Sequence, residues 1–139
     1  MGTLSNIMDY ISNVSTKYFR NGEIVFEQGE YSNGIMYFVF EGELSVLKTK
    51  QGKKKAEEIG VLEPGAFFGE MALIKSTPRM ATIMVKSPKA KLGVIDKNSF
   101  IKLSKTSPGF LFILLKSVIE RLYASEERLE ELRNKINSP

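Results

Sequence analysis

The residues with the clearest capacity for chemistry lie in one segment near the middle of the chain. Gly69 precedes a short helix-like run from Glu70 to Leu73, and Arg79 follows after a loop. Glycine lets the backbone approach a ligand closely, and the free N–H groups and positive dipole end of a helical turn attract an anion. The planar guanidinium of an arginine can donate two parallel hydrogen bonds to one phosphate. The segment therefore indicates a phosphate site.

Glu70 does not suit a phosphate, because like charges repel each other. A carboxylate beside Arg79 can instead accept a hydrogen bond from a ribose 2′-hydroxyl, as acidic residues do in dinucleotide sites. The alternative is that Glu70 and Arg79 form a surface ion pair and that the nearby glycines only shape turns. The residues alone leave these two interpretations equally open.

The composition excludes several classes of site. The chain has 139 residues with no Cys and no His, which excludes disulfides, thiolate nucleophiles, Cys/His zinc sites and histidine acid–base catalysis. The Asp and Glu residues form no cluster with the spacing of metal ligands. We therefore expect a binding protein without catalytic residues, metal or cofactor.

Short apolar or alternating runs, separated by glycines, fill the middle of the chain. They predict six or more strands of a sandwich or rolled barrel. The predicted strands are 24–26, 35–40, 44–47, 56–61, 82–85 and 91–95. Six glycines are expected to take positive φ in the turns between these runs: Gly22, Gly29, Gly34, Gly42, Gly52 and Gly65.

Helical patterns lie on both sides of the predicted strands. Apolar residues at helical spacing predict a short helix over residues 3–12, and a second short helix is expected around 99–104. Ser107 and Pro108 then supply an N-cap followed by a first-turn proline. A long helix should run from Pro108 to about Asn137, with its apolar first half packed on the strands.

A heptad register runs along this long helix. Its seam is apolar except for one serine, and consists of Leu115, Val118, Leu122, Ser125, Leu129, Leu132 and Ile136. A narrow apolar stripe favours packing against another helix, so we expect a homodimer through Leu122, Leu129, Leu132 and Ile136. The alternative is a single amphipathic helix that folds back on its own domain.

Charge and hydropathy limit the other partners. The net charge is +4, and five lysines gather between two predicted strands: Lys48, Lys50, Lys53, Lys54 and Lys55. That stretch contains Gly52 and no aromatic residue, which is typical of a solvated hairpin loop. No apolar run reaches the ~18 residues of a membrane span, and no signal-peptide pattern is present. We expect no membrane partner and a cytoplasmic location.

Two strings carry a resemblance to a known family. FGEMALI (68–74), followed four residues later by RMATI (79–83), resembles the phosphate-binding cassette of the cyclic-nucleotide-binding family, which includes the catabolite activator protein and protein kinase A regulatory subunits. The glycine-spaced strands and the long terminal helix follow the order of that family. The resemblance implies an α+β fold, an eight-stranded, jelly-roll-like β-roll with a short N-terminal helical segment and a long C-terminal helix.

The resemblance also divides the chain into parts. Residues 1–139 would be one domain. Its parts would be an N-terminal helical segment (1–20), a β-roll (21–96) that contains the cassette (68–82), and C-terminal helices (97–139).

The resemblance assigns roles to the residues of the cassette. Glu70 would accept from the ribose 2′-hydroxyl, and Arg79 would bind the exocyclic phosphate oxygens. The remaining cassette contacts are expected from Phe68, Gly69, Met71, Ala72, Met80, Ala81 and Thr82, with the N–H groups of Met71 and Ala72 on the phosphate. The base would meet an apolar wall and the terminal helix, through Val46, Ile59, Leu62, Arg121 and Ser125.

The implied function is that of a sensor that catalyses nothing. Some cGMP-preferring members carry Thr after the arginine, and Met80 cannot make the same hydrogen bond to guanine, so cAMP is the expected ligand and cGMP the second candidate. Ligand would close the cassette and move the terminal helix, in a parallel homodimer like that of the catabolite activator protein. The signal would pass to an unknown downstream protein partner.

Two alternatives remain open at this point. The expected function is that of a stand-alone cyclic-nucleotide receptor, and the alternatives are a nucleotide-independent interaction module or the ligand-binding part of a larger transcription regulator, channel or kinase. No helix-turn-helix follows the long helix before Pro139, so we expect no direct binding to DNA.

Overall fold

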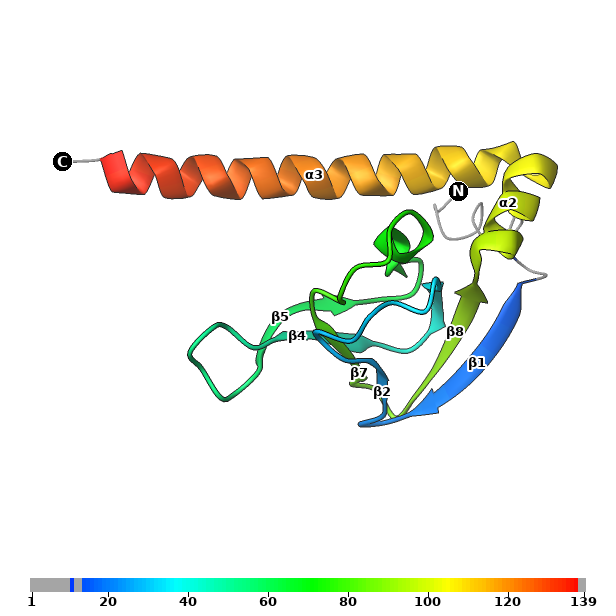
Figure 1. Cartoon of the computed structure of the whole chain (residues 1–139), viewed down its shortest axis with the longest axis horizontal. Coiled ribbons are helices and arrows are strands. Elements are labelled where there is room, and N and C mark those ends of the chain that lie inside the picture. Colours follow the sequence, from blue (N-terminus) through cyan, green and yellow to red (C-terminus); the bar gives the residue numbers. More distant parts are fainter. Residues whose placement is uncertain (1–10, 12–13, 138–139) are drawn as a thin grey trace.

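The computed structural model describes residue 11 and residues 14–137. In these residues, eight strands form two four-stranded sheets, and one long helix passes above them (Figure 1). The helix predicted over residues 3–12 lies outside the described residues apart from Ile11, which is fully buried. The described elements confirm the β-roll with a long C-terminal helix.

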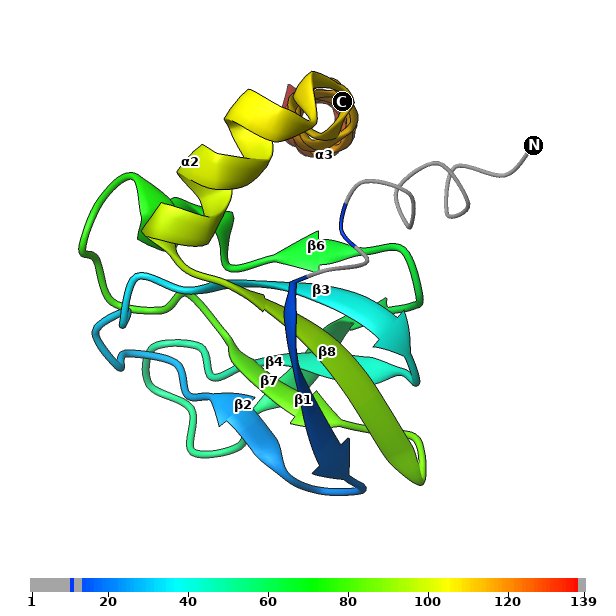
Figure 2. The ribbon, with the colours of Figure 1, turned by 90° about the vertical axis from the view of Figure 1, so that its right-hand side faces the viewer.

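All neighbouring strands in the two sheets are antiparallel, which suits short strands joined by tight turns. Figure 2 shows the sheets as two layers. One sheet has the order β1 (Ser15–Arg20), β8 (Lys89–Ile95), β3 (Met36–Glu41) and β6 (Phe67–Phe68). The other has the order β2 (Ile24–Phe26), β7 (Thr82–Val85), β4 (Leu44–Lys48) and β5 (Glu57–Leu62).

The strands predicted from the sequence are all present, with bounds close to those expected. The prediction misses β1 and β6. In β1 only Phe19 is buried, so no apolar alternation marks it, and β6 is only two residues long. Because β1 occupies residues 15–20, the roll begins before the predicted boundary at residue 21. The glycines expected in the turns all have positive φ.

Two apolar clusters fill the interior. In the first, the rings of Phe26, Tyr37 and Phe68 meet one another with centroids 5.2 to 6.0 Å apart. In the second, Phe67 packs edge-on against Phe110 of the C-terminal helix, with centroids 5.7 Å apart. The second cluster therefore holds the helix on the roll.

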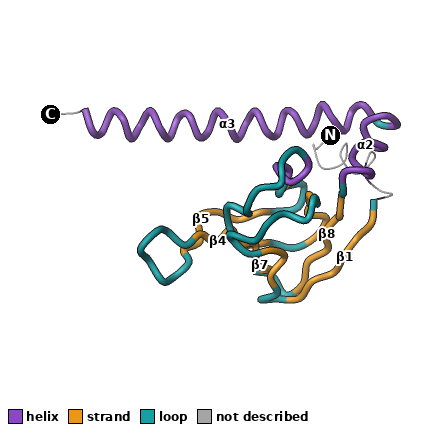
Figure 3. Tube along the Cα trace, viewed as in Figure 1, coloured by secondary structure: helices purple, strands orange, loops and turns teal. Residues whose placement is uncertain are grey.

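The C-terminal helices follow β8 directly (Figure 3). In α2 (Lys97–Thr106), the N-cap carboxylate of Asp96 accepts a hydrogen bond of 2.7 Å from the Ser99 N–H. That bond holds the pKa of Asp96 below its ordinary value, because the ionised carboxylate is the better acceptor. The next helix, α3 (Pro108–Asn137), has the bounds that the sequence predicts.

Only one face of α3 contacts the roll. In its apolar first half, Phe110 and Leu114 are buried and Ile113 is partly buried. The prediction that this half packs on the strands therefore holds for one face only, because a straight helix that crosses a roll cannot bury its other faces. The apolar side chains left exposed on α3 are Leu111, Phe112, Leu115, Val118, Ile119, Leu122, Tyr123, Leu129, Leu132 and Ile136.

The lengths and hydropathies of the described helices bear on a membrane-spanning role. None of them combines the length and the apolar character that crossing a membrane requires.

Candidate functional site

The segment that joins β6 to β7, here called the cassette (residues 68–82), passes from one sheet to the other. It turns through Gly69, which has φ of +76°, into the 3-10 helix η1 (Glu70–Leu73). On the returning limb, the Arg79 N–H donates to the Glu30 carbonyl over 2.7 Å. The returning limb is thus tied to the loop that follows β2, which fixes the backbone at Arg79.

The side chain of Arg79 is buried, with only 7% of the residue exposed. Its Nη2 donates to Asn33 Oδ1 over 3.1 Å and to the Ile35 carbonyl over 3.0 Å, and its Nη1 lies 3.4 Å from the Gly69 carbonyl. The ring of Phe26 lies against the guanidinium, with its centroid 4.0 Å from Cζ. We call Phe26, Asn33, Ile35 and Gly69 the arginine cradle.

The arginine cradle contains no negative charge. Burial lowers the pKa of Arg79, because removal from water disfavours the charged form, although an arginine side chain stays protonated in proteins. Among the described residues, no carboxylate forms an ion pair with Arg79, and its Nε–H finds no acceptor. A buried cation with an unused donor is an arrangement that suits an anionic ligand.

Glu70 pairs with the C-terminal helix rather than with Arg79. Its Oε1 lies 2.6 Å from Nη2 of Arg121, and the two side chains are 22% and 48% exposed, respectively. The alternative in which Glu70 and Arg79 form a surface ion pair is therefore wrong. The pair between Glu70 and Arg121 instead joins the cassette to α3.

A shallow, open pocket of about 220 Å³ lies beside this ion pair. Its lining residues are Glu70, Val118, Arg121, Leu122 and Ser125. The structure thus brings Arg121 and Ser125, which were predicted on the base side, together with the carboxylate predicted for the ribose. Most of the lining belongs to α3, so the shape of the pocket depends on where that helix lies.

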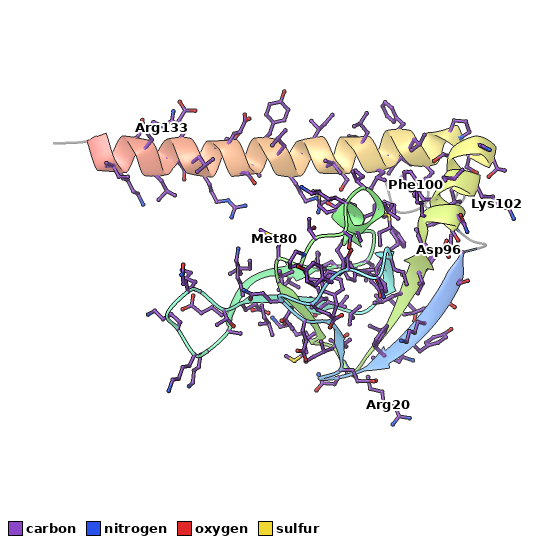
Figure 4. All side chains as sticks on the ribbon, viewed as in Figure 1. Arg20, Met80, Asp96, Phe100, Lys102 and Arg133 are labelled. Atoms are coloured by element: carbon purple, nitrogen blue, oxygen red, sulfur yellow. The ribbon has the colours of Figure 1, made fainter. Side chains whose placement is uncertain are left out.

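The other residues predicted around the base are more dispersed. Met80 is 73% exposed and lies on the side of the roll that faces α3 (Figure 4). Ile59 is exposed on β5, at the edge of its sheet, whereas Val46 and Leu62 pack partly against the core. None of these four residues lines the pocket beside α3.

Two of the predicted ligand contacts have structural roles. The ring of Phe68 is 4% exposed and stacks on Tyr37 with centroids 5.2 Å apart, so this side chain supports the cassette from within the core. The hydroxyl of Thr82 accepts a hydrogen bond of 2.9 Å from the Gln28 N–H. It thereby holds the chain segment that follows β2.

The remaining cassette positions lie near the surface. Met71 is exposed, whereas Ala72 and Ala81 are partly buried. The Ala72 N–H donates to the Gly69 carbonyl over 3.1 Å within the 3-10 turn. To donate to a phosphate, the Ala72 N–H must break its hydrogen bond to the Gly69 carbonyl or divide its proton between the two acceptors.

Sequence reasoning missed Asn33 and Phe26 as partners of Arg79. Asn33 precedes Gly34, and such a pair indicates a turn but not a distant arginine. Phe26 shows only the pattern of a buried strand residue. Both contacts form because β2 and the loop before β3 pack beneath the cassette, which no local pattern reveals.

One protein family model covers the part of the chain that forms the roll, the cassette and α2. A family model for the cyclic nucleotide-binding domain matches residues 16–107, which include the cassette and all four residues of the arginine cradle. The chain belongs to the cyclic nucleotide-binding domain family. The expected family resemblance is thereby confirmed.

Two longer proteins each contain a segment similar to this cyclic nucleotide-binding domain. It is 34% identical to the cGMP-dependent protein kinase egl-4 of Caenorhabditis briggsae over 123 residues, which cover 88% of this chain and 15% of the kinase. It is 37% identical to the cAMP-dependent protein kinase type II regulatory subunit of Drosophila melanogaster over 89 residues, which cover 63% of this chain and 22% of that protein. The chain thus spans less than a quarter of either relative.

A solved structure shares the fold. The catabolite activator protein of Thermus thermophilus matches with a TM-score of 0.77 and 21% sequence identity, over 94% of this chain and 59% of that one. At that identity the match shows the common β-roll and terminal helix.

Replacing Gly69 by alanine tests how closely the cassette backbone approaches the guanidinium. An added Cβ would lie 2.8 Å from Arg79 Nη1, and the residue would have to keep φ of +76°. The strained φ alone costs about 1–3 kcal/mol, and we expect a further loss of stability and of nucleotide affinity because Arg79 must move. Chemical denaturation and calorimetry would measure the two effects.

Gly52→Ala is the matched control for this substitution. Gly52 has φ of +84°, but nothing lies within 4 Å of its added Cβ. It should share the backbone strain and leave nucleotide affinity unchanged. Equal losses of stability and affinity in the two variants would contradict the close approach of Gly69 to Arg79.

Proposed function

We propose that this cyclic nucleotide-binding domain is a cAMP sensor. The observation that carries the proposal is the buried guanidinium of Arg79, held by neutral groups and lacking a carboxylate partner among the described residues. A cyclic phosphate would supply the missing negative charge, and two of its oxygens match the donors of a guanidinium.

The choice of cAMP over cGMP rests on Met80. This cassette side chain is exposed and carries a thioether, which is at most a weak acceptor and no donor. Met80 therefore supplies no side-chain donor to guanine at this position. Regulatory relatives of both nucleotide classes match the chain, so the base preference must be measured.

Titration calorimetry with cAMP, cGMP and a cyclic dinucleotide tests the proposal. We expect binding of cAMP with a Kd of about micromolar order, which corresponds to about 8 kcal/mol, and weaker binding of cGMP. If none of the three nucleotides binds, the domain is a nucleotide-independent interaction module. Tighter binding of cGMP would reverse the proposed base preference only.

Glu70 is proposed to accept a hydrogen bond from the ribose 2′-hydroxyl. Glu70→Ala removes the acceptor and should weaken cAMP binding by about 10- to 150-fold, because a hydrogen bond to a charged acceptor contributes about 1.5–3 kcal/mol. The matched ligand is 2′-deoxy-cAMP, which lacks the donor. 2′-Deoxy-cAMP should bind the wild-type protein weakly, and the substitution of Glu70 should lower its affinity little further. If the substitution lowers the affinities for cAMP and 2′-deoxy-cAMP equally, Glu70 does not bind the ribose 2′-hydroxyl.

The ion pair between Glu70 and Arg121 gives a route from ligand to helix. A ribose hydroxyl that donates to Glu70 must share or displace Arg121, and Arg121 lies on α3. Binding would then shift the population of α3 positions. Because the chain has no cysteine, spin labels on two introduced cysteines, Lys53→Cys and Arg133→Cys, can report the distance between the roll and α3. An unchanged distance distribution at saturating cAMP would contradict this coupling.

The exposed seam of α3 supports a parallel homodimer as the second part of the proposal. Leu122, Leu129, Leu132 and Ile136 are 55 to 81% exposed in the single chain, and such a stripe is buried when two helices pair. Sedimentation velocity at tens of micromolar protein should therefore show a dimer. Leu129→Asp should dissociate it, whereas Glu127→Lys, outside the seam, should not. If the wild-type protein is monomeric both with and without cAMP, the proposed dimer is wrong.

The proposed sensor performs no reaction. The described residues contain no group of three or more His, Cys, Asp and Glu side chains that could hold a metal ion. We expect cAMP to be recovered intact after prolonged incubation with the protein, as measured by chromatography. A downstream protein partner would receive the signal.

A further inference from the structure

We propose that Asn33 is a positioning residue that raises affinity for an anionic ligand by holding Arg79 with a neutral oxygen. The inference rests on the proposed function of Arg79 as the phosphate-binding residue. It concerns a loop that lies 46 residues before Arg79 and outside the cassette.

Asn33 is the one side chain of a described residue that accepts a hydrogen bond from the guanidinium. Its Oδ1 lies 3.1 Å from Arg79 Nη2 and also accepts from the Ile35 N–H over 3.3 Å. The second bond restricts the orientation of the amide. Asn33 therefore orients the guanidinium from a side chain that its own loop holds in place.

The neutrality of Asn33 has an electrostatic consequence. The other groups around the guanidinium are two backbone carbonyls and the face of the Phe26 ring, so nothing in the arginine cradle neutralises it. Glu30 and Tyr37 are the titratable groups whose charges act on Arg79, and neither forms an ion pair with it. A cation at a buried site without a counterion attracts an incoming anion strongly, because little solvent screens it.

A carboxylate in place of the amide would reverse this balance. Aspartate has nearly the shape of asparagine, so Asn33→Asp keeps the acceptor and adds one negative charge 3.1 Å from Nη2. The charge-assisted bond would stabilise the ligand-free protein. A phosphate would then have to compete with a resident carboxylate for the same guanidinium, and the two anions would repel each other.

Two measurements on Asn33→Asp test the proposal. The unfolding equilibrium constant without ligand, from chemical denaturation, should fall about tenfold, because a hydrogen bond to a charged group is the stronger one. The affinity for cAMP, from calorimetry, should fall by about tenfold as well. A purely structural role would move stability and affinity in the same direction, whereas this proposal requires a more stable protein that binds more weakly.

Two further variants separate position from charge. Asn33→Ala removes the acceptor without adding charge, and it should lower both stability and affinity. Gln51→Asp adds the same charge on the exposed loop between β4 and β5, and both quantities should stay at the wild-type values.

The outcomes distinguish this inference from the proposed function. If wild-type protein binds cAMP and Asn33→Asp binds it equally or more tightly, the role of Asn33 is overturned and the cAMP site stands. An unfolding constant that rises in Asn33→Asp also overturns the role of Asn33. If the wild-type protein binds no cyclic nucleotide, the proposed function fails, and the role of Asn33 in affinity fails with it.

Discussion

Replacing Arg79 by alanine should weaken cAMP binding by about 30- to 5,000-fold, which corresponds to about 2–5 kcal/mol. The guanidinium is buried in the arginine cradle, where its hydrogen-bond partners are neutral, so no described residue gives it an anionic partner. Titration calorimetry with cAMP measures the loss. An Arg79→Ala protein that binds cAMP as the wild type does would refute the site.

Two matched variants make the Arg79 experiment specific. Arg79→Lys keeps the charge but lacks the planar pair of donors, so its loss should be intermediate. Arg20→Ala removes the same charge from β1, on the side of the roll away from α3 (Figure 4), and it should bind normally. Circular dichroism of each variant would separate loss of binding from loss of fold.

Replacing Phe110 by alanine should lower the free energy of unfolding by about 3–5 kcal/mol. Phe110 is 1% exposed and packs edge-on against Phe67 of the roll and Phe100 of α2. The small residue would leave a cavity where both helices and the roll meet. Because small domains are stable by only about 5–15 kcal/mol, this loss should be visible as a large shift of the denaturation midpoint.

Phe112 is the matched control for Phe110, because it lies on the same helix but is 71% exposed. Phe112→Ala should change the free energy of unfolding by about 0.5 kcal/mol or less. Both variants should be unfolded at two protein concentrations, since any stability that comes from self-association depends on concentration. Equal losses in the two variants would mean that Phe110 does not anchor α3.

The position of α3 matters because the helix is docked at its first turns and at one ion pair. Phe110 and Leu114 are the buried apolar contacts, and Arg121 reaches Glu70 one to two turns farther along. From Leu122 to Ile136 every residue of α3 is exposed. A ligand that takes Glu70 from Arg121 would therefore act on a helix that has few other constraints.

The elements of the domain were predictable where local chemistry specifies them. The strand runs, the turn glycines and the start of α3 after Ser107 and Pro108 follow from side-chain alternation, positive φ and capping, which act within a few residues. β1 was not predictable in this way, since only Phe19 of its side chains is buried. The buried face of α3 could not be chosen either, because its first half is apolar on several faces.

For Glu70 and Arg79, too, the sequence reveals one part of the site and the tertiary structure reveals the other. The types of Glu70 and Arg79, and their places between β6 and β7, can be read from the sequence. Their partners cannot: Arg79 lies on Phe26 and Asn33, and Glu70 pairs with Arg121. These partners come from a strand, a loop and a helix that are distant in the chain, and they meet only because the sheets and α3 pack around the cassette.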